Sequence, residues 1–124
     1  MNINIKTIPH KDQRYDTCGD YWWDSETLQV RISELGRADW EFLILIHELI
    51  EWFLIHLGGI DVNDIDRFDR EYEANRKKGD ISEPGNDPKA PYHTQHMIAS
   101  AFERLLAPVL GVDWGQYEKF IDSL

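Results

Sequence analysis

One histidine and two glutamates lie within the string His47-Glu48-Leu49-Ile50-Glu51. If this segment is helical, His47 and Glu51 lie at positions i and i+4, roughly 40° apart around the helix axis and one turn apart along it. Both side chains can then reach one ion. Imidazole nitrogen and carboxylate oxygen are both zinc ligands, and a catalytic zinc site needs three protein ligands with one position left for water. The string therefore predicts two ligands of a metal site.

Glu48 is predicted to have a different role from its two neighbours. It points about 100° away from His47 on the same helix, so its carboxylate can hold a metal-bound water and accept a proton from it. A zinc ion would lower the pKa of that water from about 15.7 toward ~7. This is the division of labour in the HExxH motif of metallopeptidases, with Glu51 standing where the second histidine would be. The spacing predicts Glu48 as the general base of a metal-dependent hydrolase.

A second polar stripe lies further along the chain. His93, His96, Ser100 and Glu103 fall on one side of a predicted helix, opposite a side rich in apolar residues. If this helix packs against the first, the two polar stripes meet. His96 lies one turn inside the helix and is the predicted third ligand. Glu103 is either a fourth ligand or an acceptor that orients a ligand histidine, and His93, nearer the helix end, binds substrate or substitutes as ligand.

The two ligands of the first helix adjoin a broad apolar arc, so we expect both to be buried. The arc consists of Phe42, Ile46, Leu49, Ile50, Phe53 and Leu57. A buried carboxylate needs a metal, a cation or a proton to compensate it, and this helix contains no Lys or Arg. Zn2+ is the expected cofactor, and a site made of histidine and carboxylate also suits Mn2+ or Fe2+.

The elements that must position these residues form an α+β fold, in which a short antiparallel β-hairpin or sheet precedes a helical bundle around the motif helix. Residues 3–8 are predicted to form a first strand, and residues 15–23 and 28–33 a hairpin with a half-buried second arm. The segment 28–33 would present an edge to an extended peptide substrate. The motif helix is predicted to follow an N-cap at Asp39 and to end at about Leu57, before a Gly-Gly pair.

Three more helices and a long loop complete the predicted domain. Asp61 and Asp113 are expected to cap the second and the last helix, and the third runs over 91–106, with Pro108 limiting its end. The stretch 79–91 holds three Pro and two Gly, so we expect a loop long enough to act as a lid. Its acidic residues are expected to be solvated: Asp80, Glu83 and Asp87.

Composition excludes several classes of protein. The 124 residues are the usual size of one domain, so we treat 1–124 as a single domain. With 23 acidic and 13 basic side chains the formal charge is -10, which opposes non-specific binding to nucleic acid or to anionic membranes. The apolar stretch 42–57 is too short and too charged to span a bilayer. The N-terminus has no apolar signal segment, so we expect a cytoplasmic protein.

Several short segments together resemble small proteins of tailed bacteriophages and prophages that are described as zincin-like or metallopeptidase-like. The segments are 47–52, 59–60, 68–69, 83–85, 90–92, His96 and 110–114. The resemblance covers most of the chain. It implies a viral or prophage origin, hence the host cell cytoplasm, and a zincin-like helix with His47, Glu48, Glu51 and His96 at the motif positions. The chain departs from true zincin peptidases at Glu51, and it carries no recognisable downstream ligand motif.

The sequence leaves three functions open. The first is a minimal zinc-dependent metallopeptidase acting on a peptide or protein. The second is a non-catalytic phage accessory protein that binds a host or viral protein, in which a structural metal or a polar cluster only stabilises the fold. The third is a metal-dependent hydrolase of nucleotides or phosphoesters, which is weaker because the chain has no Gly-rich phosphate loop. Nothing in the sequence specifies the oligomeric state.

Overall fold

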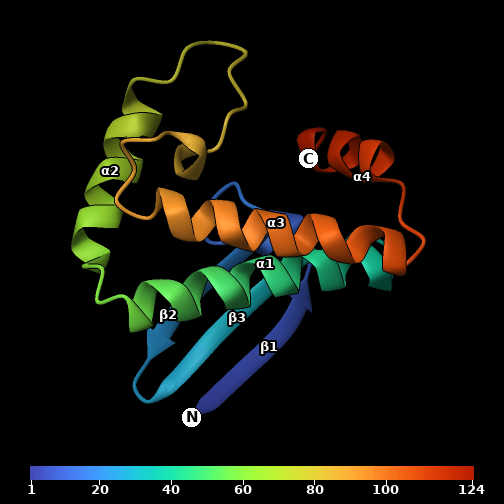
Figure 1. Cartoon of the computed structure of the whole chain (residues 1–124), viewed down its shortest axis with the longest axis horizontal. Coiled ribbons are helices and arrows are strands. Elements are labelled where there is room, and N and C mark those ends of the chain that lie inside the picture. Colours follow the sequence, from blue (N-terminus) through green and yellow to red (C-terminus); the bar gives the residue numbers. More distant parts are fainter.

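A three-stranded sheet with helices stacked on one face forms the frame of the molecule (Figure 1). The computed structural model describes all residues from 1 to 124. The elements in chain order are β1 (Asn2–Ile8), the 3-10 turn η1 (His10–Asp12), β2 (Gly19–Asp24), β3 (Thr27–Ser33), α1 (Ala38–Leu57), α2 (Val62–Ala74), the 3-10 turn η2 (Pro84–Asn86), α3 (His93–Val109) and α4 (Trp114–Asp122). The predicted α+β class is confirmed.

The strand order in the sheet is β1-β3-β2. β2 and β3 form the predicted antiparallel hairpin, whereas β1 pairs with β3 in parallel, so the sheet is mixed rather than wholly antiparallel. β3 is the central strand: Val30 is the register partner of Ile5 on one side and of Tyr21 on the other. The prediction that 28–33 offers an edge to a peptide is therefore wrong, because both sides of this strand are already paired. The two edges belong to β1 and β2.

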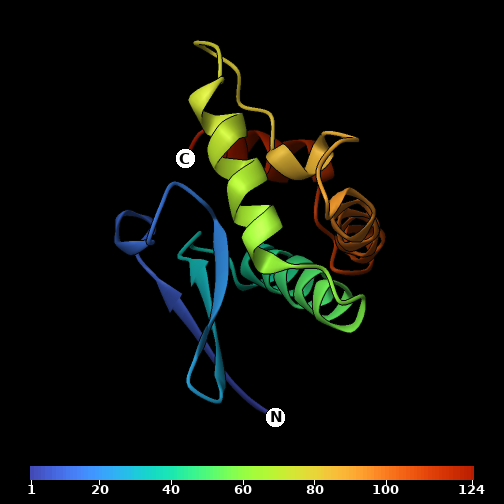
Figure 2. The same cartoon turned by 90° about the vertical axis from the view of Figure 1, so that its left-hand side faces the viewer.

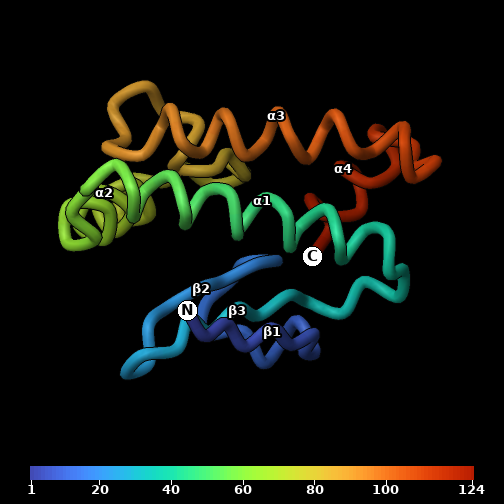
Figure 3. Tube along the Cα trace, turned by 60° about the horizontal axis from the view of Figure 1, so that its bottom comes forward, coloured from blue at the N-terminus to red at the C-terminus, as the bar shows by residue number.

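The main core lies between the sheet and α1. Leu28, Val30 and Ile32 alternate along β3 and are at most 2 % exposed, as expected for a strand with one face against the core. Figure 3 shows the sheet, α1 and α3 as successive layers. Residues from the other elements complete the cluster: Leu35, Trp40, Leu43, Ile44, Trp52, Ala107, Val112 and Tyr117. The motif helix α1 is thus the central layer of the fold.

Side-chain caps explain two of the helix starts. Asp61 accepts a hydrogen bond from the backbone of α2, and Asp113 does the same for α4, as predicted. The predicted cap at Asp39 is wrong, since Arg37 is the N-cap residue of α1. Asp39 lies in the first turn, where its carboxylate pairs with Arg37 and accepts from the Trp40 N–H, a favourable position for negative charge near the helix N-terminus.

α1 and α3 run antiparallel and side by side (Figures 1 and 3). α3 begins at His93 rather than Pro91, and it continues past Pro108, which lies in its last turn. The buried stripe of α3 consists of His96, Ala99, Glu103 and Ala107, so its polar stripe faces inward as predicted. None of the helices is both long and apolar enough to cross a membrane.

The buried side of α1 is not the one that its apolar arc suggested. Phe42 is 39 % exposed and Leu57 is 77 % exposed, while His47 and Glu51 are buried. The reason is that α1 turns the side bearing Trp40 and its polar residues toward the sheet and α3. The expectation that the two polar residues are buried is correct, but the apolar arc is only half-buried or exposed.

Candidate metal centre

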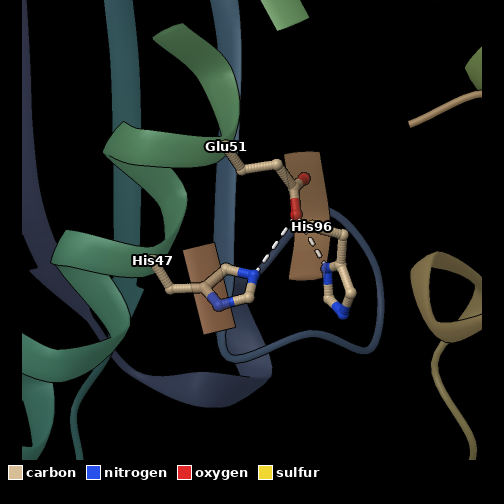
Figure 4. A group of neighbouring side chains, drawn as sticks. All are labelled: His47, Glu51 and His96. Atoms are coloured by element: carbon tan, nitrogen blue, oxygen red, sulfur yellow. Dashed lines mark hydrogen bonds and ion pairs between the residues drawn. The ribbon is translucent and has the colours of Figure 1, made fainter. Parts of the chain in front are cut away.

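Side chains from two helices converge at the contact between α1 and α3. One ligand atom each from His47, Glu51 and His96 lie within 4.8 Å of one another. His47 Nε2 is 3.2 Å from Glu51 Oε2, and His96 Nδ1 is 2.8 Å from the same oxygen. Figure 4 shows both rings directed at that carboxylate. The structure therefore brings together the three residues that the sequence predicted as ligands.

Helix geometry and helix packing together bring His47, Glu51 and His96 close to one another. The i, i+4 spacing on α1 stacks His47 and Glu51 one turn apart, and α3 supplies His96 from 45 residues further along the chain. All three residues are between 5 and 9 % exposed. The two imidazole rings meet edge to face, with their centroids 4.9 Å apart. The group is thus built on rigid elements and shielded from bulk water.

Both histidines are also held from outside the group. His47 Nδ1 is 2.9 Å from Glu103 Oε2, and His96 Nε2 is 3.1 Å from both Glu83 Oε2 and Asn86 Oδ1. Each ring therefore points one nitrogen at Glu51 and fixes the other on an oxygen acceptor. Histidines that bind metals in proteins are held in the same way, because the outer acceptor selects the tautomer and orients the ring.

Two tyrosines extend the network to the other layers. Tyr117 on α4 donates a hydrogen bond of 2.5 Å to Glu103 Oε1, and Tyr21 on β2 donates one of 3.1 Å to Glu51 Oε1. Glu51 Oε1 is thus occupied by the tyrosine, while Oε2 faces both histidines. The sheet and α4 consequently help to fix carboxylates that are attached to α1 and α3.

Hydrogen-bonded ion pairs within the group set the pKa values of His47, His96 and Glu51. Burial alone would lower the pKa of His47, but hydrogen bonds with Glu103 and Glu51 outweigh it and raise this pKa to about 11. Burial likewise opposes the charged form of His96, whose bonds to Glu51 and Glu83 raise its pKa to about 9. Burial would raise the pKa of Glu51, but the two histidines lower it to about 2. Without a metal, the centre is a buried network of ion pairs.

Glu48 lies on another side of α1, against strand β2. It is half-buried, and a Cβ atom added at Gly19 would lie only 2.6 Å from its Cγ and Oε1 atoms. Glycine is therefore required at 19 to admit this side chain between α1 and the sheet. Burial, reinforced by the nearby charge of Glu51, raises the pKa of Glu48 to about 8. The residue is neither exposed nor paired with a cation, which is typical of a group with a chemical role.

Glu103 and His93, the other two predicted site residues, do not share one position relative to the group. Glu103 contacts His47 through the outer nitrogen, which is the geometry of an orienting acceptor rather than of a fourth ligand. His93 lies outside the group, and its Nδ1 donates a hydrogen bond of 2.9 Å to the carbonyl of Gly85. It holds the loop that precedes α3 and does not face Glu51.

Sequence reasoning missed the residues that support the centre from loops and from other layers. They are Tyr21, Glu83, Gly85, Asn86 and Tyr117. The Pro-Gly pair at 84–85 indicated a turn but not its contact with His96, and the loop was expected only to act as a lid or to be solvated. The tyrosines carry no spacing signal, because a hydroxyl that reaches a glutamate from another element leaves no local pattern in the sequence.

A substitution at Gly85 tests the importance of that loop. A Cβ atom there would lie 2.5 Å from the ring of His96, so Gly85→Ala must displace either the ring or the loop. We expect zinc affinity to fall roughly 10-fold or more, the usual effect of disturbing groups that orient a ligand. Competition with a chromogenic chelator measures this affinity. Gly115→Ala on α4, whose nearest atom would be 3.4 Å away, is the matched control, and equal affinities for the two variants would contradict the prediction.

The chain matches no protein family, no curated protein and no solved structure. The functional conclusion therefore depends on the geometry of the site.

Proposed function

We propose that this chain is a metal-dependent hydrolase that binds zinc through His47, Glu51 and His96 and cleaves peptide bonds. One observation carries the proposal. Two buried histidines point one nitrogen each at the same glutamate oxygen, while oxygen acceptors hold both outer nitrogens. Metal-ligating histidines are held in this way, with one nitrogen directed at the ion and the other fixed on an outer acceptor.

The residues fit a zinc ion in type and in spacing. Ligand atoms that are 2.0–2.2 Å from a common tetrahedral ion lie about 3.4 Å apart. The two shortest separations in the group are 2.8 and 3.2 Å, and all three atoms lie within 4.8 Å of one another, so shifts of about an ångström would complete the set. Three protein ligands leave one position for water, as catalytic zinc requires. Mn2+ and Fe2+ accept the same donors.

The proposal gives this chain's own residues distinct catalytic roles. A zinc ion would supply Lewis acidity, which makes water a nucleophile near neutral pH. Glu48 would orient that water and accept its proton, then deliver the proton to the leaving amine. As a base Glu48 must be ionised, and a nearby dication favours that form. Tyr21 and Glu103 would keep Glu51 and His47 aligned throughout.

The position of β2 supports a peptide as the substrate. β2 is an edge strand, and its first residue, Gly19, lies against Glu48. An extended peptide that pairs with the free side of this strand would pass beside the proposed base, and main-chain hydrogen bonds would hold it there. The proposed substrate edge is therefore β2, since the central strand is already paired on both sides.

Proton release distinguishes metal binding at this group from adventitious binding. Since the pKa values of His47 and His96 are raised to about 11 and about 9, both rings carry a proton at pH 7 and must lose it to coordinate a metal. We expect about two protons to be released per zinc bound at pH 7. Affinity should rise with pH up to about 11, and the slope should fall from two protons to one above about 9. Titration calorimetry in buffers of different ionisation enthalpy measures the number released. A value near zero would place the metal elsewhere.

A peptide-cleavage assay with and without zinc tests the proposed function. Untagged protein loaded with one equivalent of zinc is incubated with a library of quenched fluorescent peptides. We expect cleavage that is abolished by a chelator and restored by zinc. Absence of cleavage from protein that is shown to hold zinc would overturn the enzymatic proposal but leave the metal site standing.

The alternative is a non-catalytic binding protein in which the polar group only stabilises the fold. The observation that favours it is that the ion pairs of Glu51 with His47 and His96 are complete without any metal. On this alternative, zinc would neither bind tightly nor raise the melting temperature. The elemental analysis described in the Discussion separates the two.

A further inference from the structure

A large apolar face lies on the side of α1 and α3 that points away from the metal centre. We call it the α1–α3 face and define it as Phe42, Ile46, Leu49, Ile50, Phe53 and Leu57 of α1 with Ile98, Phe102, Leu105 and Val109 of α3. Every one of these residues is exposed or half-buried. In Figure 2 no other element covers the lower right-hand side of the helix pair. The main core contains none of the exposed members.

The spacing along both helices is that of an interhelical seam. On α3, the sequence Ile98, Phe102, Leu105, Val109 advances by four, three and four residues, as the inner positions of a helical bundle do. On α1, Phe42, Ile46, Leu49 and Phe53 advance in the same way. A helix surface that only faces water does not maintain such a pattern over three turns. Both helices are therefore built to pack on a second side.

The two seams meet in a groove without polar walls. The groove has a volume of about 440 Å³ and is lined only by Leu49, Ile50, Phe53, Leu54, Ile98 and Phe102. Such a groove accepts large apolar side chains from a facing helix, in the manner of knobs and holes.

The charge distribution separates this face from the rest of the protein. Among the exposed residues of α3 only Arg104 is charged, and its guanidinium lies 4.8 Å from the ring centre of Trp114. The whole chain carries a formal charge of -10. A second acidic chain can approach closely only where charges are absent, as they are here. Anionic lipid would be repelled by the remaining surface.

The exposed area agrees with a stable interface. Phe42, Phe102, Leu105 and Val109 are 39, 48, 67 and 79 % exposed. Leu57 and Ile98 are 77 and 40 % exposed. With roughly 150–200 Å² for each large apolar side chain, these six residues offer roughly 500–700 Å² of apolar surface. This area lies at or above the upper end of the largest patch of a typical monomer, roughly 300–600 Å², and approaches the roughly 800 Å² that each partner contributes to a standard interface.

We propose that the α1–α3 face is the interface of a symmetric homodimer. Because α1 and α3 run antiparallel, a two-fold axis through the groove brings two such pairs together as a four-helix bundle, and each copy offers the same surface to the other. The metal centres lie on the opposite sides of α1 and α3 from this interface, so dimer formation does not require metal. A second copy fits this face better than an unrelated partner, because both sides are equally long, apolar and free of charge.

The test is the mass of the full chain in solution, measured by sedimentation equilibrium between about 1 and 200 µM. The wild-type protein is expected to have twice the mass of one chain at the upper concentrations. Phe102→Glu and Leu105→Glu place a charge on each side of the symmetric seam and should weaken the dimer at least 100-fold. Val62→Glu, at a position 59 % exposed on α2, is the matched control and should remain dimeric.

The two variants must also be shown to fold. Because both positions are about half exposed or more, far-UV circular dichroism and zinc content should equal those of the wild type. A wild-type protein that is monomeric at 200 µM, or one that binds neutral lipid vesicles through this face instead, would overturn the proposal. So would folded Phe102→Glu and Leu105→Glu proteins that dimerise like the wild type. None of these outcomes bears on the hydrolase, since zinc content and peptide cleavage are measured separately.

Discussion

Replacing His96 by alanine should reduce bound zinc from about one ion per chain to less than about a tenth, measured by mass spectrometry of the purified, untagged protein. The variant loses one of three ligands, and the remaining two cannot hold the ion against buffer competition. Glu51→Gln should have the same effect, because its carboxylate is the only negatively charged ligand. His56→Ala is the matched control: it also removes a histidine, but one that is exposed near the end of α1 and lies outside the group.

Stability gives an independent measure of the same site. In the metal-free protein, Glu51→Gln removes the carboxylate shared by two buried, protonated histidines. Loss of one partner from a buried ion pair costs about 3–5 kcal/mol, which should appear as a lower midpoint of urea unfolding. Zinc retained by both His96→Ala and Glu51→Gln would rule out the proposed site. If no sample holds metal even after reconstitution, the group is a buried polar network and the binding-protein alternative is favoured.

Replacing Glu48 by glutamine should reduce the rate of peptide cleavage by 10²- to 10⁴-fold while zinc content stays the same. The amide keeps the shape that fits against Gly19 but cannot accept a proton, so only general base catalysis is lost. Steady-state assays on the zinc-loaded variant measure this effect. The reduction is expected in kcat, because the base acts in the chemical step rather than in substrate binding.

The control for this substitution lies on the same helix. Glu41 is half-buried on α1, and its Oε1 accepts a hydrogen bond from the Leu35 N–H, which a glutamine oxygen can also accept. Glu41→Gln should therefore leave both zinc content and cleavage unchanged. Full activity in Glu48→Gln would remove Glu48 from the mechanism, and equal losses in the two variants would indicate a general effect on α1.

Local sequence patterns were sufficient for much of the candidate site. The i, i+4 spacing of His47 and Glu51 needs only a helix, and hydrophobic periodicity with the two glycines after Leu57 made that helix predictable. The polar stripe of α3 pointed to His96 and Glu103 for the same reason. The hairpin and the caps at Asp61 and Asp113 are also short-range features, because each depends on contacts within a few residues of the chain.

Other features were decided only by the tertiary structure. The sequence predicted the strand 28–33 but not its place between β1 and β2, because pairing with residues 2–8 is a long-range contact without local signal. The sequence also did not predict which side of α1 packs inward. Its most continuous apolar arc is only half covered by the fold, and the side bearing His47 and Glu51 packs inward.

One physical cause separates the features that the sequence predicted from those that only the tertiary structure decided. Helix and turn formation depend on neighbouring residues, so the chain's own pattern determined which side chains share a helix face. Which faces meet depends on the packing of elements far apart in the sequence, and only the fold decided that Glu83, Asn86, Tyr21 and Tyr117 surround the three central residues. The same packing left the α1–α3 face exposed. From the sequence alone this face was indistinguishable from core, because burial inside one chain and burial between two chains require the same apolar pattern.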